Sequence, residues 1–98
     1  MERSAEILNA GSCIGSIVIS TAGRDRYRRF MIVGLCEGGE ETGMVLIADG
    51  SLRVIDAPKQ KKLRHLKIIE CGNEERVKLI ESKLVTNKFL KELLTAYA

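Results

Sequence analysis

The chain has 98 residues, of which 45% are hydrophobic, and a formal net charge of +3 at pH 7, so it is sized for one small domain that buries a core without disulfides or metal ions. With two Tyr, two Phe and no Trp, that core must be aliphatic, and the low aromatic count argues against an aromatic platform for single strands. No leader peptide and no apolar run of about 18 residues is visible, and the three cysteines are widely spaced. These features predict a cytoplasmic protein with reduced thiols and no metal or cofactor.

Residues 1–13 are predicted to be a polar N-terminal extension with a short helical stretch over residues 4–8. Residues 14–20 are rich in β-branched side chains and predict the first strand. Residues 30–36 form a nearly continuous apolar run, which is typical of a strand buried on both faces. Cys36, at the end of this run, is expected to be a small buried hydrophobic residue.

The segment between these two strands concentrates positive charge. Residues 20–30 contain four arginines and a single acid, Asp25, which is expected to pair with one of them. Gly23 stands at the bend and lets the backbone turn without steric strain. Guanidinium groups match phosphate geometry and stack on bases, so a loop of this composition between two apolar strands predicts a phosphate-binding site. Its candidate residues are Arg24, Arg26, Arg28 and Arg29.

Three further strands are predicted along the chain. Residues 37–43 read as an acidic, glycine-rich loop and residues 44–48 as the third strand. Asp49 and Gly50 are a strong hairpin signal, because both central positions of a type I′ turn need a positive φ. They predict a tight turn into a fourth strand over residues 51–55.

Beyond Pro58, residues 59–64 are predicted to be a basic connection, and residues 66–70 the fifth strand. The connection returns to the same barrel as the arginine loop and forms a second candidate phosphate-binding segment. Its cations are Lys59, Lys61, Lys62 and Arg64. His65 is expected to be structural, because no second histidine or nearby cysteine pair accompanies it.

Five short strands joined by tight turns predict a small closed barrel over residues 14–70. The expected interior residues are Ile17, Ile19, Ile32, Val45, Ile47, Leu52 and Val54. Residues 71–98 predict a helical tail, so the expected fold class is α+β with strands first and helices last.

The tail contains signals for two helices. Asn73 is a good N-cap with acids in the following turn, and Thr86 can cap a second helix. The apolar stripe of the first is expected to be Val77, Ile80 and Leu84. In the second, Phe89, Leu93 and Tyr97 recur at four-residue spacing beside Leu90 and Leu94.

Four pieces of the chain, in order, resemble the KOW motif of large-subunit ribosomal proteins and transcription elongation factors. They are IVISTAGRD at 17–25 with FMIVG at 30–34, VLIADG at 45–50, LR at 52–53, and PKQKKLRHL at 58–66. The chain is most similar to the ribosomal branch of archaea and eukaryotes and to its small bacterial relatives, the KOW-domain RNA-binding proteins. The resemblance covers residues 14–67, and residues 86–94 resemble the tail of the bacterial relatives.

This resemblance implies an SH3-like five-stranded barrel of the KOW type that binds RNA through its first hairpin loop. It assigns Gly23 to the motif glycine. The basic positions of the motif fall on Arg24, Arg26 and Arg28, and the basic segment before the His-Leu pair on Lys59, Lys61, Lys62 and Arg64. Where relatives often have a second glycine, this chain has Tyr27, which either stacks on a base or lies over the barrel edge. The implied partners are ribosomal RNA and ribosomal proteins, with no membrane.

Two other interpretations remain open at this stage. The basic segments could be solvated loops, or the barrel could be an SH3-like protein-interaction module. Such a module needs an aromatic groove, which four aromatic residues hardly supply, and its partner contact could instead be the C-terminal amphipathic helix. That helix could also dock on the barrel. Catalysis is not expected, because no paired acids, nucleophilic dyad or nucleotide-binding glycine loop is present.

Overall fold

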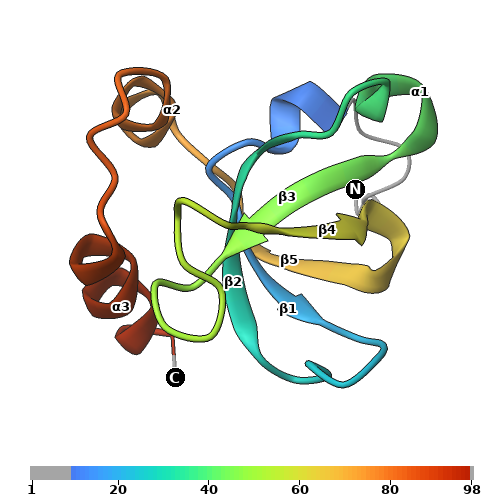
Figure 1. Cartoon of the computed structure of the whole chain (residues 1–98), viewed down its shortest axis with the longest axis horizontal. Coiled ribbons are helices and arrows are strands. Elements are labelled where there is room, and N and C mark those ends of the chain that lie inside the picture. Colours follow the sequence, from blue (N-terminus) through green and yellow to red (C-terminus); the bar gives the residue numbers. More distant parts are fainter. Residues whose placement is uncertain (1–9, 98) are drawn as a thin grey trace.

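The computed structural model describes residues 10–97 of the chain. It contains a five-stranded antiparallel sheet with two C-terminal helices on one side (Figure 1). The strands are β1 (Ile17–Ser20), β2 (Arg29–Leu35), β3 (Met44–Ala48), β4 (Lys59–Lys62) and β5 (Leu66–Glu70). The helical elements are η2 (Ala10–Cys13), α1 (Gly39–Thr42), η3 (Leu63–His65), α2 (Glu74–Glu81) and α3 (Asn87–Thr95). The predicted α+β class is confirmed.

The sheet has the strand order β4-β3-β2-β1-β5 and is open. β4 and β5 are its two edges, and no hydrogen-bonded ladder joins them within residues 10–97. The short η3 turn connects one edge to the other, so the sheet must curl until these edges approach each other at that end. The intervening residues are wound into a helical turn and cannot pair as strand. The prediction of a closed barrel is therefore wrong.

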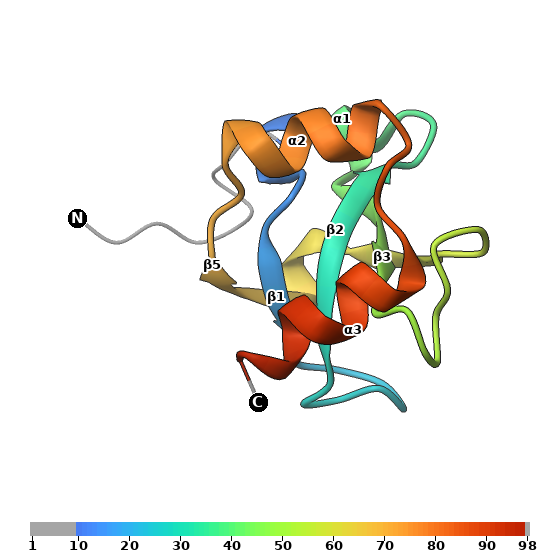
Figure 2. The same ribbon diagram turned by 90° about the vertical axis from the view of Figure 1, so that its left-hand side faces the viewer.

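The three central strands contribute buried side chains to both faces of the sheet. In the second strand, which was predicted to be buried on both faces, Phe30, Met31 and Ile32 are fully buried and residues 33–36 only partly. Val18, Phe30, Ile32, Val45, Ile47, Leu63 and Leu66 belong to the cluster inside the curled sheet. Ile17, Met31, Ala48, Val85, Leu90 and Leu94 form the second cluster, beneath the helices. Figure 2 shows α3 lying across β1 and β2 on that side. Alternate side chains of each strand thus enter different clusters.

The predicted fourth strand is wrong in position. Residues 51–55 form no strand, and β4 (Lys59–Lys62) pairs with β3 instead, with Lys61 opposite Val45. Consequently Leu52, expected in the interior, is 55% exposed. Val54 is only partly buried, as is Ile19. Ile32, Val45 and Ile47 are buried inside the curled sheet as expected, whereas Ile17 is buried on the opposite face, beneath the helices.

Packing against α3 explains why the chain after β3 does not form a hairpin. Gly50 has a φ of +82°, and a Cβ at this position would lie 2.3 Å from the carbonyl oxygen of Asn87. The Asn87 side chain in turn accepts a hydrogen bond from the Ile55 amide at 2.8 Å. Only glycine permits this close approach. The Asp-Gly pair therefore marks a loop that docks on the helix.

Both predicted N-caps are confirmed. The Asn73 side chain accepts from the Arg76 amide at 2.8 Å, and Thr86 Oγ1 accepts from the Phe89 amide at 3.1 Å. Leu84 was expected in the apolar stripe of the first helix, but it lies beyond the end of α2 and is 64% exposed. The acidic loop over residues 37–43 contains α1, and the helical stretch expected over residues 4–8 lies outside the described residues.

Candidate functional site

The loop between β1 and β2 is closed by backbone hydrogen bonds at its base. The Tyr27 amide donates to the Ser20 carbonyl at 2.7 Å, and the Ser20 amide donates to the Arg28 carbonyl at 3.0 Å. Gly23 has a φ of +84°, so it occupies the left-handed region that favours glycine. These bonds hold the arginine-rich residues in one defined loop at the end of the sheet.

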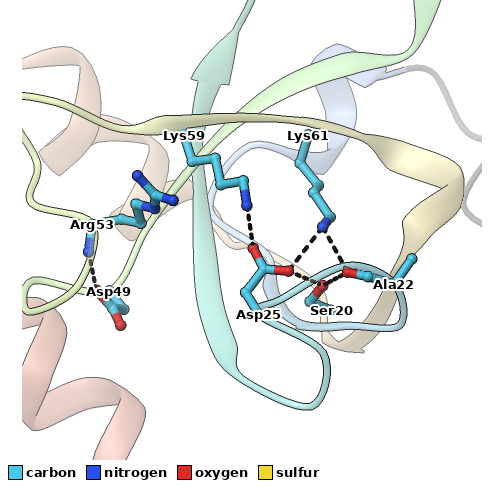
Figure 3. A network of polar contacts seen from close by, with 7 residues as sticks. All are labelled: Ser20, Ala22, Asp25, Asp49, Arg53, Lys59 and Lys61. Atoms are coloured by element: carbon cyan, nitrogen blue, oxygen red, sulfur yellow. Dashed lines mark hydrogen bonds and ion pairs between the residues drawn. The ribbon is translucent and has the colours of Figure 1, made fainter.

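Asp25 is the centre of a buried polar network inside this loop (Figure 3). The residue is 3% exposed. Its carboxylate accepts from Lys59 Nζ at 2.9 Å, from Lys61 Nζ at 2.8 Å and from Ser20 Oγ at 2.8 Å. Lys61 Nζ also donates to the Ala22 carbonyl at 2.8 Å. The expected pairing of Asp25 with an arginine is therefore wrong, because strand β4 brings two lysines over the loop.

The network keeps the Asp25 carboxyl ionised. Burial by itself would raise the pKa of Asp25, but the hydrogen bonds from Lys61, Lys59 and Ser20 outweigh it and hold this pKa well below its usual value. The carboxylate thus binds both ammonium groups, one through each of its oxygens, and balances one of their two positive charges. Lys59 and Lys61 reach into the loop from β4, and Lys61 is only 8% exposed.

Other cations of the two basic segments face solvent. Arg24 and Arg26 in the loop and Lys62 and Arg64 in the β4–η3 segment are all exposed. The two segments are tied together by Thr21, whose amide and Oγ1 both donate to the His65 carbonyl at 2.9 Å. Within residues 10–97, no carboxylate lies within ion-pair distance of these four cations.

Lys67 adds a further exposed cation that the sequence-based site omits. It lies in β5 opposite Ile19 of β1, two residues from the start of the loop. A signal existed in the sequence, because Lys67 follows the basic run directly. The pairing of β5 with β1 is what brings it to the loop.

Tyr27 adopts an unusual backbone conformation for a tyrosine. Its φ is +72°, in the left-handed region, where a residue other than glycine is less stable by about 1–2 kcal/mol. The backbone at Tyr27 therefore has a conformation in which glycine is favoured. The side chain is 71% exposed, so the protein core does not explain its presence.

The last two arginines of the loop are held differently from the others. Arg28 Nη2 lies 3.1 Å from Asp49 Oδ2, and the Arg28 side chain is 48% exposed. Burial would raise the pKa of Asp49, but hydrogen bonds from the Arg53 and Ser51 amides and from Arg28 lower it below its usual value. Arg29 is partly buried, and its Nε has no hydrogen-bond partner within the described residues.

The three cysteines differ in burial. Cys13 is buried, Cys36 is only partly buried where full burial was expected, and Cys71 is exposed. Burial raises the pKa of the Cys13 thiol, with a further contribution from Cys71. Residues 10–97 contain no group of three or more His, Cys, Asp or Glu side chains placed to hold a metal ion. In the same part of the chain, every helix is too short or too polar to cross a bilayer.

No protein-family model matches the chain, and no curated protein matches it.

Proposed function

We propose that this protein binds RNA through the surface formed by the β1–β2 loop and the β4–η3 segment. This surface is called the basic face, and its residues are Arg24, Arg26, Tyr27, Arg28, Lys62 and Arg64. The proposal depends mainly on one observation, that the carboxylates near this surface are already paired within the protein. Asp25 is occupied by the buried Lys61 and the partly buried Lys59, and Asp49 by Arg28 and backbone amides. Arg24, Arg26, Lys62 and Arg64 are therefore left without a carboxylate within ion-pair distance in residues 10–97.

Unpaired cations on a fixed loop suit a polyanion with regularly spaced phosphates. Binding neutralises several phosphates and releases condensed counter-ions, which supplies most of the affinity for nucleic acids at moderate salt. Guanidinium groups bind phosphate through two parallel hydrogen bonds, and arginines outnumber lysines in the basic face. The exposed Tyr27 ring offers a stacking surface that is worth about 1–3 kcal/mol per base when used. Lys59 and Lys61 hold the loop against β4 through their hydrogen bonds to Asp25.

The proposed fold type is an SH3-like, partly open barrel of the KOW type. Two features support it: the sheet curls around one internal cluster, and a single η3 turn joins its edge strands. The proposed partner is ribosomal RNA, with ribosomal proteins as neighbours, in line with the sequence resemblance. Sedimentation of the native protein with ribosomes at low and high salt tests this partner. Free migration at every salt concentration would favour the protein-interaction module instead.

Fluorescence anisotropy with a labelled RNA at several salt concentrations tests RNA binding directly. The variant Arg24→Ala/Arg26→Ala removes two exposed cations from the basic face. The matched control Lys78→Ala/Lys88→Ala removes two exposed cations from α2 and α3. Because each phosphate contact contributes a slope of about −0.7 to −0.9, we expect the first variant to flatten the salt dependence by about 1.5. Equal slopes in the two variants would contradict the proposed site.

A further inference from the structure

A second feature of the loop lies on the side that faces α3. A hollow of about 530 Å³ separates the end of the β1–β2 loop from this helix. It is lined by Tyr27, Arg28, Arg29, Asp49, Ser51, Lys91, Leu94 and Thr95. It therefore combines an exposed aromatic ring, three cations and one acid, contributed by three separate segments of the chain. Its volume lies within the range of about 300–1,000 Å³ that is usual for small-molecule sites.

The charge balance of this hollow favours an anion. Asp49 is its one acid, and both carboxylate oxygens are already engaged. Oδ1 accepts from the Ser51 and Arg53 amides at 3.0 and 2.8 Å, and Oδ2 accepts from Arg28. The carboxylate of Asp49 thus balances the charge of Arg28. The charges of Arg29 and Lys91 remain unbalanced by any carboxylate within residues 10–97.

Arg29 supplies an independent indication. Its side chain is partly buried, and its Nε is fully buried without a hydrogen-bond partner in the described part of the chain. A buried donor that lacks a partner destabilises a fold by about 1–3 kcal/mol. Because this Nε is closed to solvent, the partly exposed remainder of the Arg29 side chain, which lines the hollow, is the part that can offer its charge to a ligand.

We infer that this hollow holds one nucleotide of single-stranded RNA, with its phosphate near Arg29 and Lys91 and its base against Tyr27. This inference rests on the proposed RNA binding and extends it from the loop to α3. Leu94 adds apolar surface beside the cations. A single strand is required because a base in a duplex remains stacked and paired and cannot enter a concave site, whereas an unpaired base can be splayed out.

Charge reversal on α3 tests the inference with a matched control. Lys91 lines the hollow, and Lys88, also exposed and on the same helix, does not. Lys91→Glu and Lys88→Glu change the net charge equally. We expect Lys91→Glu to weaken binding of a single-stranded oligoribonucleotide about tenfold more than Lys88→Glu. The two variants should bind an RNA duplex of the same sequence equally.

A charge-neutral variant provides a second readout. Ser51 is exposed and lines the hollow, and Ser51→Trp fills space there while keeping its backbone amide. We expect it to reduce the preference for single strand over duplex, with circular dichroism checking that the fold is kept. If both Lys91→Glu and Ser51→Trp bind single strands like Lys88→Glu, the inference is overturned. A loss of binding in Arg24→Ala/Arg26→Ala would show in that case that RNA binding itself still stands.

Two further measurements show whether RNA binding as a whole fails or only the assignment of the hollow to a nucleotide within a strand. Absence of binding to either RNA by the parent protein at low salt would overturn both proposals together. Competition with free AMP distinguishes a nucleotide within a strand from a free nucleotide. We expect AMP to displace the strand only at millimolar concentrations, and displacement at micromolar concentrations would overturn the assignment to a strand.

Discussion

The two sides of the β1–β2 loop carry the same kinds of residue in opposite roles. On the inner side, Asp25 and Lys61 are buried together at 2.8 Å and fix the loop to β4. On the outer side, Arg24 and Arg26 flank Asp25 in sequence and are exposed without an acid within ion-pair distance in residues 10–97. The difference teaches that the internal ion pairs remove the acids from the surface and thereby leave the outer face positive.

The largest expected effect is the loss of the inner network. Lys61→Ala leaves the buried Asp25 carboxylate with Lys59 as its one cation and removes the Nζ donor from Asp25 Oδ1 and from the Ala22 carbonyl. We expect the free energy of unfolding to fall by about 3 kcal/mol, since each buried acceptor that loses its donor costs about 1–3 kcal/mol. Lys62→Ala, one position along the same strand and exposed, should change it by less than about 0.5 kcal/mol. Urea denaturation measures both. Similar losses in the two variants would remove the distinction between the inner and outer sides.

The pH dependence of stability sharpens the same comparison. Because the folded-state pKa of Asp25 is depressed, its contribution is fully present above the unfolded pKa of about 3.9 and is lost as the pH falls below it toward the folded value. We expect the parent to lose up to about 1.4 kcal/mol per pH unit there through this group. Asp25→Asn should show a shallower decline between about pH 4 and pH 2 in urea unfolding series. Parallel curves for the two proteins would contradict the depressed pKa.

Tyr27 allows the backbone and the ring to be separated. Tyr27→Gly removes the ring and also relieves the left-handed strain, whereas Tyr27→Ala removes the ring and keeps the strain. We expect both variants to lose about 1 kcal/mol of RNA affinity with an unchanged salt slope. Only the glycine variant should exceed the parent in thermal stability. Full affinity in both would assign the ring no part in binding.

The smallest effect is expected at the far end of the sheet, where α1 lies away from the β1–β2 loop (Figure 1). Glu40 and Glu41 are exposed there. Glu40→Gln/Glu41→Gln should leave RNA affinity unchanged or slightly increase it, because these acids contribute only screened, long-range repulsion. A clear loss of affinity in the anisotropy assay would place the RNA contact at the wrong end of the molecule.

Local patterns were sufficient where the deciding contacts are close in sequence. The strands β3 and β5 have the predicted bounds, and Asn73 and Thr86 cap helices as expected. The fourth strand was misplaced because its position depends on a remote contact. Gly50 and the loop after it pack on Asn87 of α3, and this docking leaves residues 59–62 to pair with β3.

The sequence by itself determined the α+β order, the aliphatic core and the two segments that concentrate cations. Only the tertiary structure decided which of those cations are buried. Lys61 and Lys62 are adjacent and chemically identical, but strand alternation turns one inward, where it meets an acid 36 positions away in the chain. Burial of an ion is stable only beside such a partner. Because the partner is brought there by folding, composition and spacing cannot distinguish the structural cations from those left at the surface.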